Sequence, residues 1–185
     1  MSMITMQEMK SKLKGIKSDI IIKFNTLLSF LDDKDREYSE YIHQLKLNKL
    51  MDIIIAIPGL LFGVFGTPIL IIYSYFKYQS KTYPIACLTV VSLNHSLKYI
   101  FKRSRPNINN VKQRYIPLIK MHHDPAMPSG DVAQSVTAAL TLIKYGYPNW
   151  LLYIIPTTSA FARVYFGNHW IGDTIIGGII AYGMT

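Results

Sequence analysis

The fold is decided by an uncharged stretch of 24 residues, 53–76, which reads IIIAIPGLLFGVFGTPILIIYSYF. A helix rises about 1.5 Å per residue, so this stretch is long enough to cross a hydrocarbon core of about 30 Å. Pro58 and Pro68 interrupt it, but neighbouring helices in a membrane bundle can satisfy the carbonyl groups that a proline frees. The stretch therefore predicts a membrane-spanning helix.

Four more apolar runs occur further along the chain. They cover residues 84–101, 129–147, 149–166 and 172–185. The last run reaches only about 21 Å as a helix, so it needs a thinner bilayer or a natural chain that continues beyond Thr185. Together the runs predict an all-α fold: a polytopic transmembrane helical bundle of about five spans, formed by one domain, residues 51–185.

The first fifty residues have a different pattern. Between residues 13 and 31 apolar side chains recur at helical spacing, and lysines lie mainly elsewhere around the helix. We expect residues 1–50 to contain an amphipathic helix. It lies in the lipid interface, or it packs on the bundle or on a second copy of the chain as a homo-oligomer, and the pattern favours neither alternative. The highly charged residues 32–40 predict a solvated linker.

The charge distribution favours lipid head groups over nucleic acid as partners. The net charge is +9, and seven of the eleven acidic residues precede Lys49, so basic residues dominate the remainder of the chain. No basic stripe interleaved with aromatic residues is present, and Lys and Arg gather at the ends of the apolar runs. We therefore expect membrane lipids as partners and no nucleic acid. The single cysteine, Cys87, can form no internal disulfide.

The first motif with chemical content lies at the end of the second apolar run. Lys98 and Arg105 are seven residues apart, or about two turns, so they share one face if the helix continues to Pro106. Two cations on one face can bind one anion. The alternative is that cations at a helix end simply reach toward head groups, which is what we expect of Lys102 and Arg103.

The second motif, PSGD at residues 128–131, precedes the third run. Ser129 is a suitable N-cap, and the first N–H groups of a helix form an anion site. Backbone amides at Ser129 and Gly130, together with the Ser129 hydroxyl, would donate to phosphate oxygens. An ordinary capped turn at the start of a helix explains the same residues.

The third motif is the most specific. His169 and Asp173 are four residues apart, so on a helix the carboxylate can accept from one imidazole nitrogen and leave the other free to attack. Arg163 would supply a permanently charged clamp for phosphate oxygens. Burying a charged side chain within a membrane costs free energy, so a charged residue at that depth is typically there for a functional reason. The alternative is a structural ion pair between Arg163 and Asp173. With five spans, all three motifs lie on one side of the membrane.

In order and spacing these segments resemble the signature of the type 2 phosphatidic acid phosphatase superfamily, Lys-x6-Arg-Pro, Pro-Ser-Gly-His and Ser-Arg-x5-His-x3-Asp. The resemblance covers residues 84–185 and implies an integral-membrane lipid phosphatase with no metal or other cofactor and with a phosphohistidine intermediate. The phosphate-binding residues that it implies are Lys98, Arg105, Ser129, Gly130 and Arg163. The catalytic residues that it implies are His169 as nucleophile, Asp173 as the residue that orients it, and Asp131.

This chain departs from that signature at two positions. Ala162 replaces the serine, which removes one hydroxyl donor. Asp131 replaces the histidine that is proposed to protonate the leaving group, and a carboxylate is normally deprotonated near neutral pH. Three explanations remain: burial makes Asp131 an acid, the leaving group needs no acid, or the protein is not catalytic. We favour the second, which predicts an isoprenoid or other lipid diphosphate as substrate.

Three classes of function are therefore open: a lipid phosphate or diphosphate phosphatase, which we favour, a lipid phosphotransferase with the same intermediate, and a catalytically silent lipid-phosphate-binding protein. We expect a multi-pass protein of the endoplasmic reticulum or plasma membrane. Two further groups are candidates only. His122, His123 and Asp124 form a possible metal or acid–base cluster, and His95 a possible buried or supporting histidine.

Overall fold

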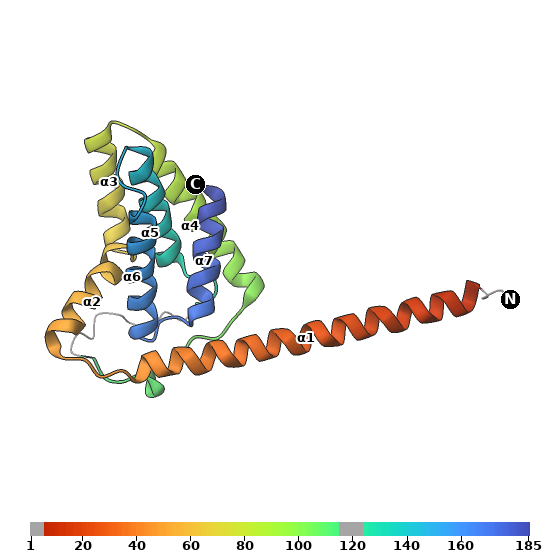
Figure 1. The fold of residues 1–185 in the computed structure, drawn as a ribbon. Coiled ribbons are helices and arrows are strands. Elements are labelled where there is room, and N and C mark those ends of the chain that lie inside the picture. Colours follow the sequence, from red (N-terminus) through yellow and green to blue (C-terminus); the bar gives the residue numbers. More distant parts are fainter. Residues whose placement is uncertain (1–5, 115–123) are drawn as a thin grey trace.

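The structure is a computed structural model and describes residues 6–114 and 124–185. Across these residues the chain folds into helices and contains no strand, so the all-α prediction is confirmed. The α-helices are α1 (Met6–Gln44), α2 (Lys49–Leu61), α3 (Gly66–Tyr78), α4 (Thr82–Phe101), α5 (Gly130–Lys144), α6 (Leu151–Tyr165) and α7 (Ile171–Met184), and a short 3-10 helix, η1, spans Ile108–Asn110 (Figure 1).

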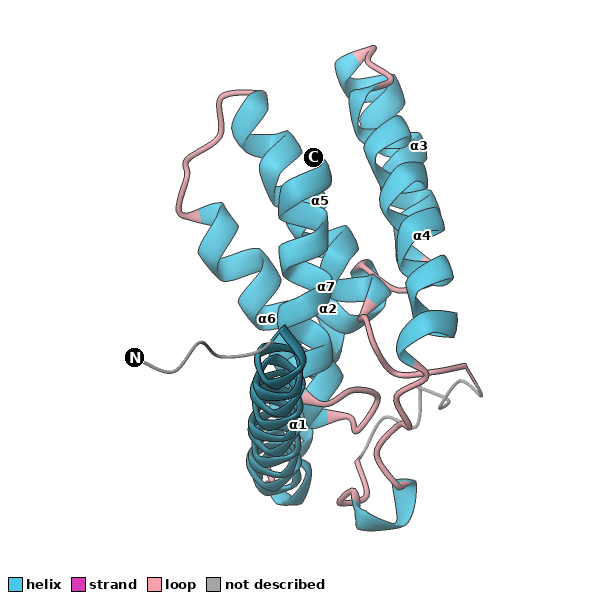
Figure 2. Ribbon diagram, turned by 90° about the vertical axis from the view of Figure 1, so that its right-hand side faces the viewer, coloured by secondary structure: helices cyan, strands magenta, loops and turns pink. Residues whose placement is uncertain are grey.

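Helix α5 is the centre of the bundle and packs against α4, α6 and α7 (Figure 1). Its buried side chains are mostly small or hydroxyl-bearing, which lets the surrounding helices approach closely. Helix α2 packs on α6, and α3 runs beside α4 (Figure 2). In this arrangement the start of α5, the end of α6 and the start of α7 meet at one end of the bundle.

The stretch predicted to be one span is two helices. Helices α2 and α3 are bent by 62° at a short break. Glycines within the break and at the start of α3 explain it, because a Cβ at Gly63 would lie 2.7 Å from Nη2 of Arg163, and a Cβ at Gly66 would lie 2.2 Å from the carbonyl oxygen of Leu61. The bend therefore lets α6 place an arginine against the end of α2.

The other four apolar runs coincide with α4 to α7 to within a few residues. Among the described residues, the bent α2–α3 pair has the length and composition to cross a membrane, whereas no helix does so by itself. Helix α7 is apolar but shorter. The positions of the helices are thus confirmed, and the number of spans stays a prediction.

The prediction of a linker at residues 32–40 is wrong, because these residues continue α1. Helix α1 runs crosswise to the bundle, past the end at which α5 to α7 meet, and extends well beyond it (Figure 1). Its charged second half is not simply solvated, since it contacts α6, α7 and η1. Further toward its N-terminus large apolar side chains are exposed, among them Ile20, Phe24 and Leu28. What covers them stays a prediction.

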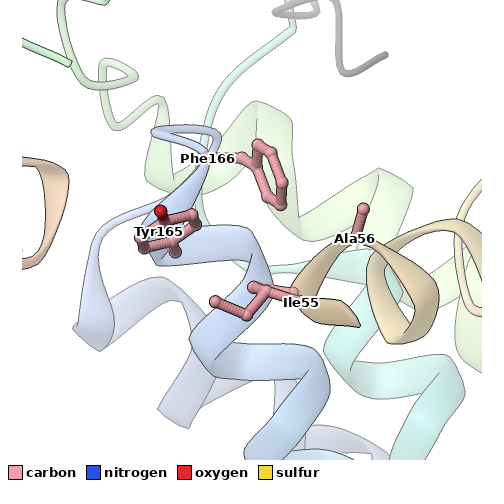
Figure 3. Close-up of a cluster of buried hydrophobic side chains, with 5 residues drawn as sticks. Ile55, Ala56, Tyr165 and Phe166 are labelled. Carbon is pink, nitrogen blue, oxygen red and sulfur yellow. The ribbon is translucent and has the colours of Figure 1, made fainter. Parts of the chain in front are cut away.

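A small apolar cluster fixes the end of α6. Ile55 and Ala56 of α2 pack against Tyr165 and Phe166 (Figure 3), and Ala162 completes the cluster. The hydroxyl of Tyr165 donates to Oδ1 of Asp52 at 2.5 Å. This packing holds the segment that leads from Arg163 into the turn before α7. It also shows that Ala162, where the signature has serine, lies in an apolar environment.

Candidate active site

Lys98 and Arg105 do not share a helix face as predicted, because α4 ends at Phe101 and Lys102 adopts a left-handed conformation with φ of 49°. The two cations nevertheless meet. Nζ of Lys98 forms an ion pair with Oδ2 of Asp124, and Nη2 of Arg105 lies 2.9 Å from Oδ1 of the same carboxylate. Tertiary structure, rather than helical spacing, therefore brings these two side chains together.

Asp124 is held from several directions. Nε of Arg105 donates to its carbonyl oxygen at 2.9 Å, in addition to the two ion pairs. Although partial burial opposes the shift, Lys98 and Arg105 lower the pKa of Asp124 to about 2. Asp124 is thus anchored as a carboxylate by two of the predicted phosphate ligands. Its predicted cluster partners, His122 and His123, lie outside the described residues, and His95 is exposed rather than buried.

The start of α5 forms as predicted, with Ser129 as the N-cap residue. The Ser129 N–H and hydroxyl, however, do not both face an open phosphate site as predicted. The Ser129 N–H donates to the carbonyl oxygen of Asp173 at 2.9 Å, so it is not free to bind phosphate. The Ser129 hydroxyl is buried and has no hydrogen-bond partner among the described residues. A Cβ at Gly130 would meet nothing within 4 Å, so the space beside this amide is open.

Arg163 is nearly buried, with 6% of its side chain exposed. Its Nε lies 2.7 Å from Oδ2 of Asp131, and its Nη2 donates to the carbonyl oxygen of Gly59 at the end of α2. The alternative of an Arg163–Asp173 ion pair is therefore wrong. The guanidinium instead joins α6 to α2 and to the first turn of α5.

His169 and Asp173 are close, but they do not lie on one helix. His169 precedes the N-cap residue Trp170, and Asp173 accepts the Trp170 N–H at 2.9 Å as part of a capping box. Oδ2 of Asp173 lies 3.5 Å from Nδ1 of His169, a distance at the limit of hydrogen bonding at which Nδ1 forms no well-aligned bond among the described residues. Burial lowers the pKa of His169, so its imidazole is neutral at neutral pH.

The turn that carries His169 is tied to the first motif through the backbone. Nη1 of Arg105 donates to the carbonyl oxygen of Asn168 at 2.7 Å, and the Asn168 N–H donates to the carbonyl oxygen of Arg163 at 3.0 Å. Gly167 has φ of 71°, a conformation that suits glycine. These bonds link Arg105 of the first motif and Arg163 of α6 to the turn that carries His169, and the role of each residue in catalysis stays a prediction.

Sequence reasoning missed Arg103, which was expected only to reach toward head groups. The structure pairs it with three carboxylates: Asp173 at 2.8 Å, Asp35 at 2.7 Å and Asp32 at 2.5 Å. A signal was present in the sequence, because Asp32, Asp35 and Ser39 recur at helical spacing. Their partners, however, lie about 70 residues or more away and carry no local pattern.

The sequence model of the PAP2 superfamily matches residues 79–185. The crystal structure of LpxE from Aquifex aeolicus has a similar fold, with a TM-score of 0.61 and 24% identity over 78% of this chain and 88% of that one. So has a transmembrane PAP2 type phosphatidylglycerolphosphate phosphatase from Bacillus subtilis, with a TM-score of 0.64 and 18% identity over 90% of this chain and 92% of that one.

A comparison with curated proteins finds no significant match. The superfamily match covers more than half of the 185 residues and contains all three motifs, from Lys98 to Asp173. The chain therefore belongs to the PAP2 superfamily.

Proposed function

We propose that this protein is a membrane-embedded phosphatase that hydrolyses a lipid phosphate or diphosphate through a phosphohistidine on His169. One observation carries the proposal: a buried neutral imidazole lies beside the Asp173 carboxylate, at the end of the bundle where Arg105 and Arg163 are also held. A neutral nitrogen next to fixed cations is what nucleophilic attack on an anionic phosphoryl group requires.

The reaction can be derived from the orientation of the ring. Nδ1 faces Asp173, so Nε2 is the attacking atom. As the bond from Nε2 to phosphorus forms, the bond from phosphorus to the leaving oxygen breaks, and the electron pair leaves with that oxygen. Water then attacks phosphorus, the nitrogen–phosphorus bond breaks and its electron pair returns to Nε2, which restores the neutral histidine. One proton of the water stays on the inorganic phosphate and the other is released to solvent. Asp173 stabilises the imidazolium character that develops in the first step.

The positive groups stabilise charge on the transferring phosphoryl oxygens. Arg163 and the open space beside Gly130 lie at the N-terminus of α5, and Lys98 and Arg105 of the first motif are brought together by Asp124. To bind phosphate, these cations must exchange carboxylate partners for phosphoryl oxygens, because Asp131 and Asp124 pair with them in this structure.

The pairing of Asp131 supports a diphosphate substrate. Its carboxylate lies 2.7 Å from Nε of Arg163, so it is engaged in an ion pair instead of standing free as a proton donor. A lipid diphosphate expels a phosphate monoester, which is a stable anion, whereas a lipid monophosphate expels an alkoxide that requires a proton. The Bacillus subtilis protein is described as acting on phosphatidylglycerolphosphate, so this chain would differ from it in preferring a diphosphate.

Two features support a lipid and a membrane. A cavity of about 860 Å³ with an almost wholly apolar lining lies among α2, α3, α5 and α6. Its wall includes Pro58, Leu61 and Phe161, each within two residues of Gly59 or Arg163 in the sequence, so an acyl or prenyl chain in this cavity would lie near the Arg163 contact with α2. The outer faces of the bundle expose large apolar side chains, among them Ile69, Ile72, Phe76, Ile85, Leu88, Tyr153, Ile154, Ile175 and Ile179.

The test is phosphate release by the detergent-purified protein from a prenyl diphosphate, with chelator present. We expect release that falls by at least about 1,000-fold in His169→Ala, since loss of a nucleophile removes the whole covalent route. His95→Ala, which changes an exposed histidine on α4, is the matched control and should keep wild-type activity. An acid-labile phosphate label on the wild type that is absent from His169→Ala would identify the intermediate.

A silent lipid-phosphate-binding protein is the second candidate, and one observation favours it. Asp124 forms ion pairs with Lys98 and Arg105, and Asp131 forms one with Arg163. Each of the three predicted phosphate-binding cations is therefore paired with a carboxylate of the protein. This alternative predicts no release above His169→Ala from either diphosphate or monophosphate lipids, together with retained lipid binding. Turnover that depends on His169 would exclude it, and a clear preference for the monophosphate would contradict the diphosphate assignment.

A further inference from the structure

Arg103 links α1 to the aspartate beside the nucleophile. Its Nη1 lies 2.8 Å from Oδ1 of Asp173, while its Nη2 lies 2.7 Å from Asp35 and 2.5 Å from Asp32. Only 10% of the Arg103 side chain and none of the Asp173 side chain is exposed. One planar guanidinium thus joins the loop after α4, the first turn of α7 and the second half of α1.

The same face of α1 holds the start of α7 directly. The Gly172 N–H donates to Oδ1 of Asp35, and the Ile171 N–H donates to Oγ of Ser39, both at 2.9 Å. One turn further along α1, the His43 ring lies 5.6 Å from the Trp170 ring. We call the residues Asp32, Asp35, Ser39 and His43 the α1 polar stripe, since their spacing places them on one face of the helix.

The geometry of the Asp173 carboxylate shows why this link bears on the chemistry. Oδ2 faces Nδ1 of His169 and accepts the Trp170 N–H, while Oδ1 is held by Arg103. With both oxygens engaged, the plane of the carboxylate is fixed. If Arg103 were removed, Oδ1 would be left buried beside no cation, and the carboxylate would be free to rotate away from the imidazole.

We propose that Arg103, held by the α1 polar stripe, is a positioning residue for the reaction, and that it fixes Asp173 so that Oδ2 faces Nδ1 of His169. This inference rests on the proposed function of His169. It assigns a role to an unspecified position of the first motif, between Lys98 and Arg105, and makes α1, which lies outside the residues that match the superfamily, a structural part of the active site.

The first experiment compares Arg103→Gln and Arg103→Lys with Lys102→Gln, which removes the neighbouring exposed cation. We expect Arg103→Gln to lower kcat by about 10- to 100-fold with little change in KM, as is typical when a residue that orients a functional group is lost. Arg103→Lys keeps the charge but cannot bridge the carboxylates in the same plane, so its loss should be intermediate. Lys102→Gln should match the wild type.

The pH profile separates positioning from a purely structural role. The groups that face His169 are Asp173 on α7, Arg105 on the loop after α4, Asp131 on α5 and, at the His169 backbone, His43 on α1. Arg103 acts on it through Asp173. Loss of Arg103 removes a positive charge that lies next to Asp173 and close to the imidazole, and a nearby cation disfavours the imidazolium. We therefore expect the acid limb of kcat/KM to move up by about one pH unit in Arg103→Gln and to stay in place in Arg103→Lys.

A second variant tests the link between Arg103 and Asp35 of α1 without changing a charge. A Cβ at Gly172 would lie 2.6 Å from Oδ2 of Asp35 and 3.2 Å from Nη1 of Arg103, so Gly172→Ala should displace this ion pair while α7 still forms. Gly183→Ala is the matched control on the same helix, because a Cβ there meets nothing within 4 Å. We expect kcat to fall in the first variant and to be unchanged in the second.

Three outcomes would overturn the inference: wild-type kcat and acid limb in Arg103→Gln, a defect confined to KM, or a loss that is matched by the loss of folded protein. If the wild type turns over no lipid, the proposed function fails, and the inference is then decided by NMR. A titration of ¹⁵N-labelled histidine, with His169 assigned from His169→Gln, should show a higher pKa for His169 in Arg103→Gln. An unchanged pKa would sink the inference independently of activity.

Discussion

The carboxylate of Asp131 lies 2.7 Å from Nε of Arg163, so the residue that replaces the signature histidine is paired with a predicted phosphate ligand. A carboxylate at this place competes with phosphate for the guanidinium, whereas a neutral histidine would not. We therefore expect the departure from the signature to change phosphate binding as well as acid catalysis, and both effects can be measured.

Asp131→Asn should tighten the binding of inorganic phosphate, because it removes the charge that competes for Arg163. We expect the inhibition constant of phosphate to fall by about 3- to 10-fold, the size of effect typical of one partly exposed charge. Asp33→Asn, an exposed position on α1, is the control and should leave the constant unchanged. Equal or weaker binding in Asp131→Asn would show that Asp131 does not compete with phosphate.

Asp131→His should restore an acid that can protonate an alkoxide leaving group. We expect the ratio of kcat/KM for a prenyl monophosphate to that for the diphosphate to rise by at least about 10-fold, since general acids contribute at least that much. Asp131→Asn provides the comparison, because it removes the same charge without adding an acid. A ratio that is the same in both variants would mean that protonation of the leaving group does not limit turnover.

Gly177→Ala should damage the contact between α7 and the start of α5. A Cβ at Gly177 would lie 2.4 Å from the carbonyl oxygen of Ser129, and backbone cannot move aside as a flexible side chain can. We expect the free energy of unfolding to fall by about 1–3 kcal/mol, as measured by thermal unfolding in detergent. Gly178→Ala is matched in sequence and helix, and its Cβ would be in ordinary contact at 3.7 Å from Val136, so it should be neutral or slightly stabilising.

His43→Phe should make the protein less sensitive to acid. Burial lowers the pKa of His43 from its ordinary 6.5, although the nearby backbone of His169 opposes the shift. A histidine with a lowered folded-state pKa contributes its stability fully above about pH 6.5, and the contribution is lost as the pH falls through the folded-state value. We expect His43→Phe to flatten this loss in thermal unfolding between about pH 7.5 and 5.

The comparison for this variant is His95→Phe, which changes an exposed histidine and should keep the wild-type pH dependence. Burial lowers the pKa of His169 as well, so a part of the acid sensitivity should persist in His43→Phe. If His43→Phe unfolds with the same pH dependence as the wild type, His43 does not couple the packing of α1 to pH.

The sequence by itself determined the helical class, the positions of α4 to α7 and the identities of the motif residues, because apolar runs and fixed short spacings are local properties of the chain. It misjudged the geometry that depends on where helices end. The 53–76 stretch breaks between α2 and α3, and His169 lies before α7 instead of on it, since Asp173 caps that helix.

Only the tertiary structure decided which charges pair. Arg103 and Asp173 are 70 residues apart, and Lys98 and Asp124 are 26 apart, so no periodic pattern relates them. Helical spacing predicts a partner only within about one turn, whereas an ion pair forms with whichever opposite charge the packing brings to within about 4 Å. For this reason the residues of the site could be named from the sequence, whereas the carboxylates that pair with Arg103, Arg105 and Arg163 could not be predicted from it.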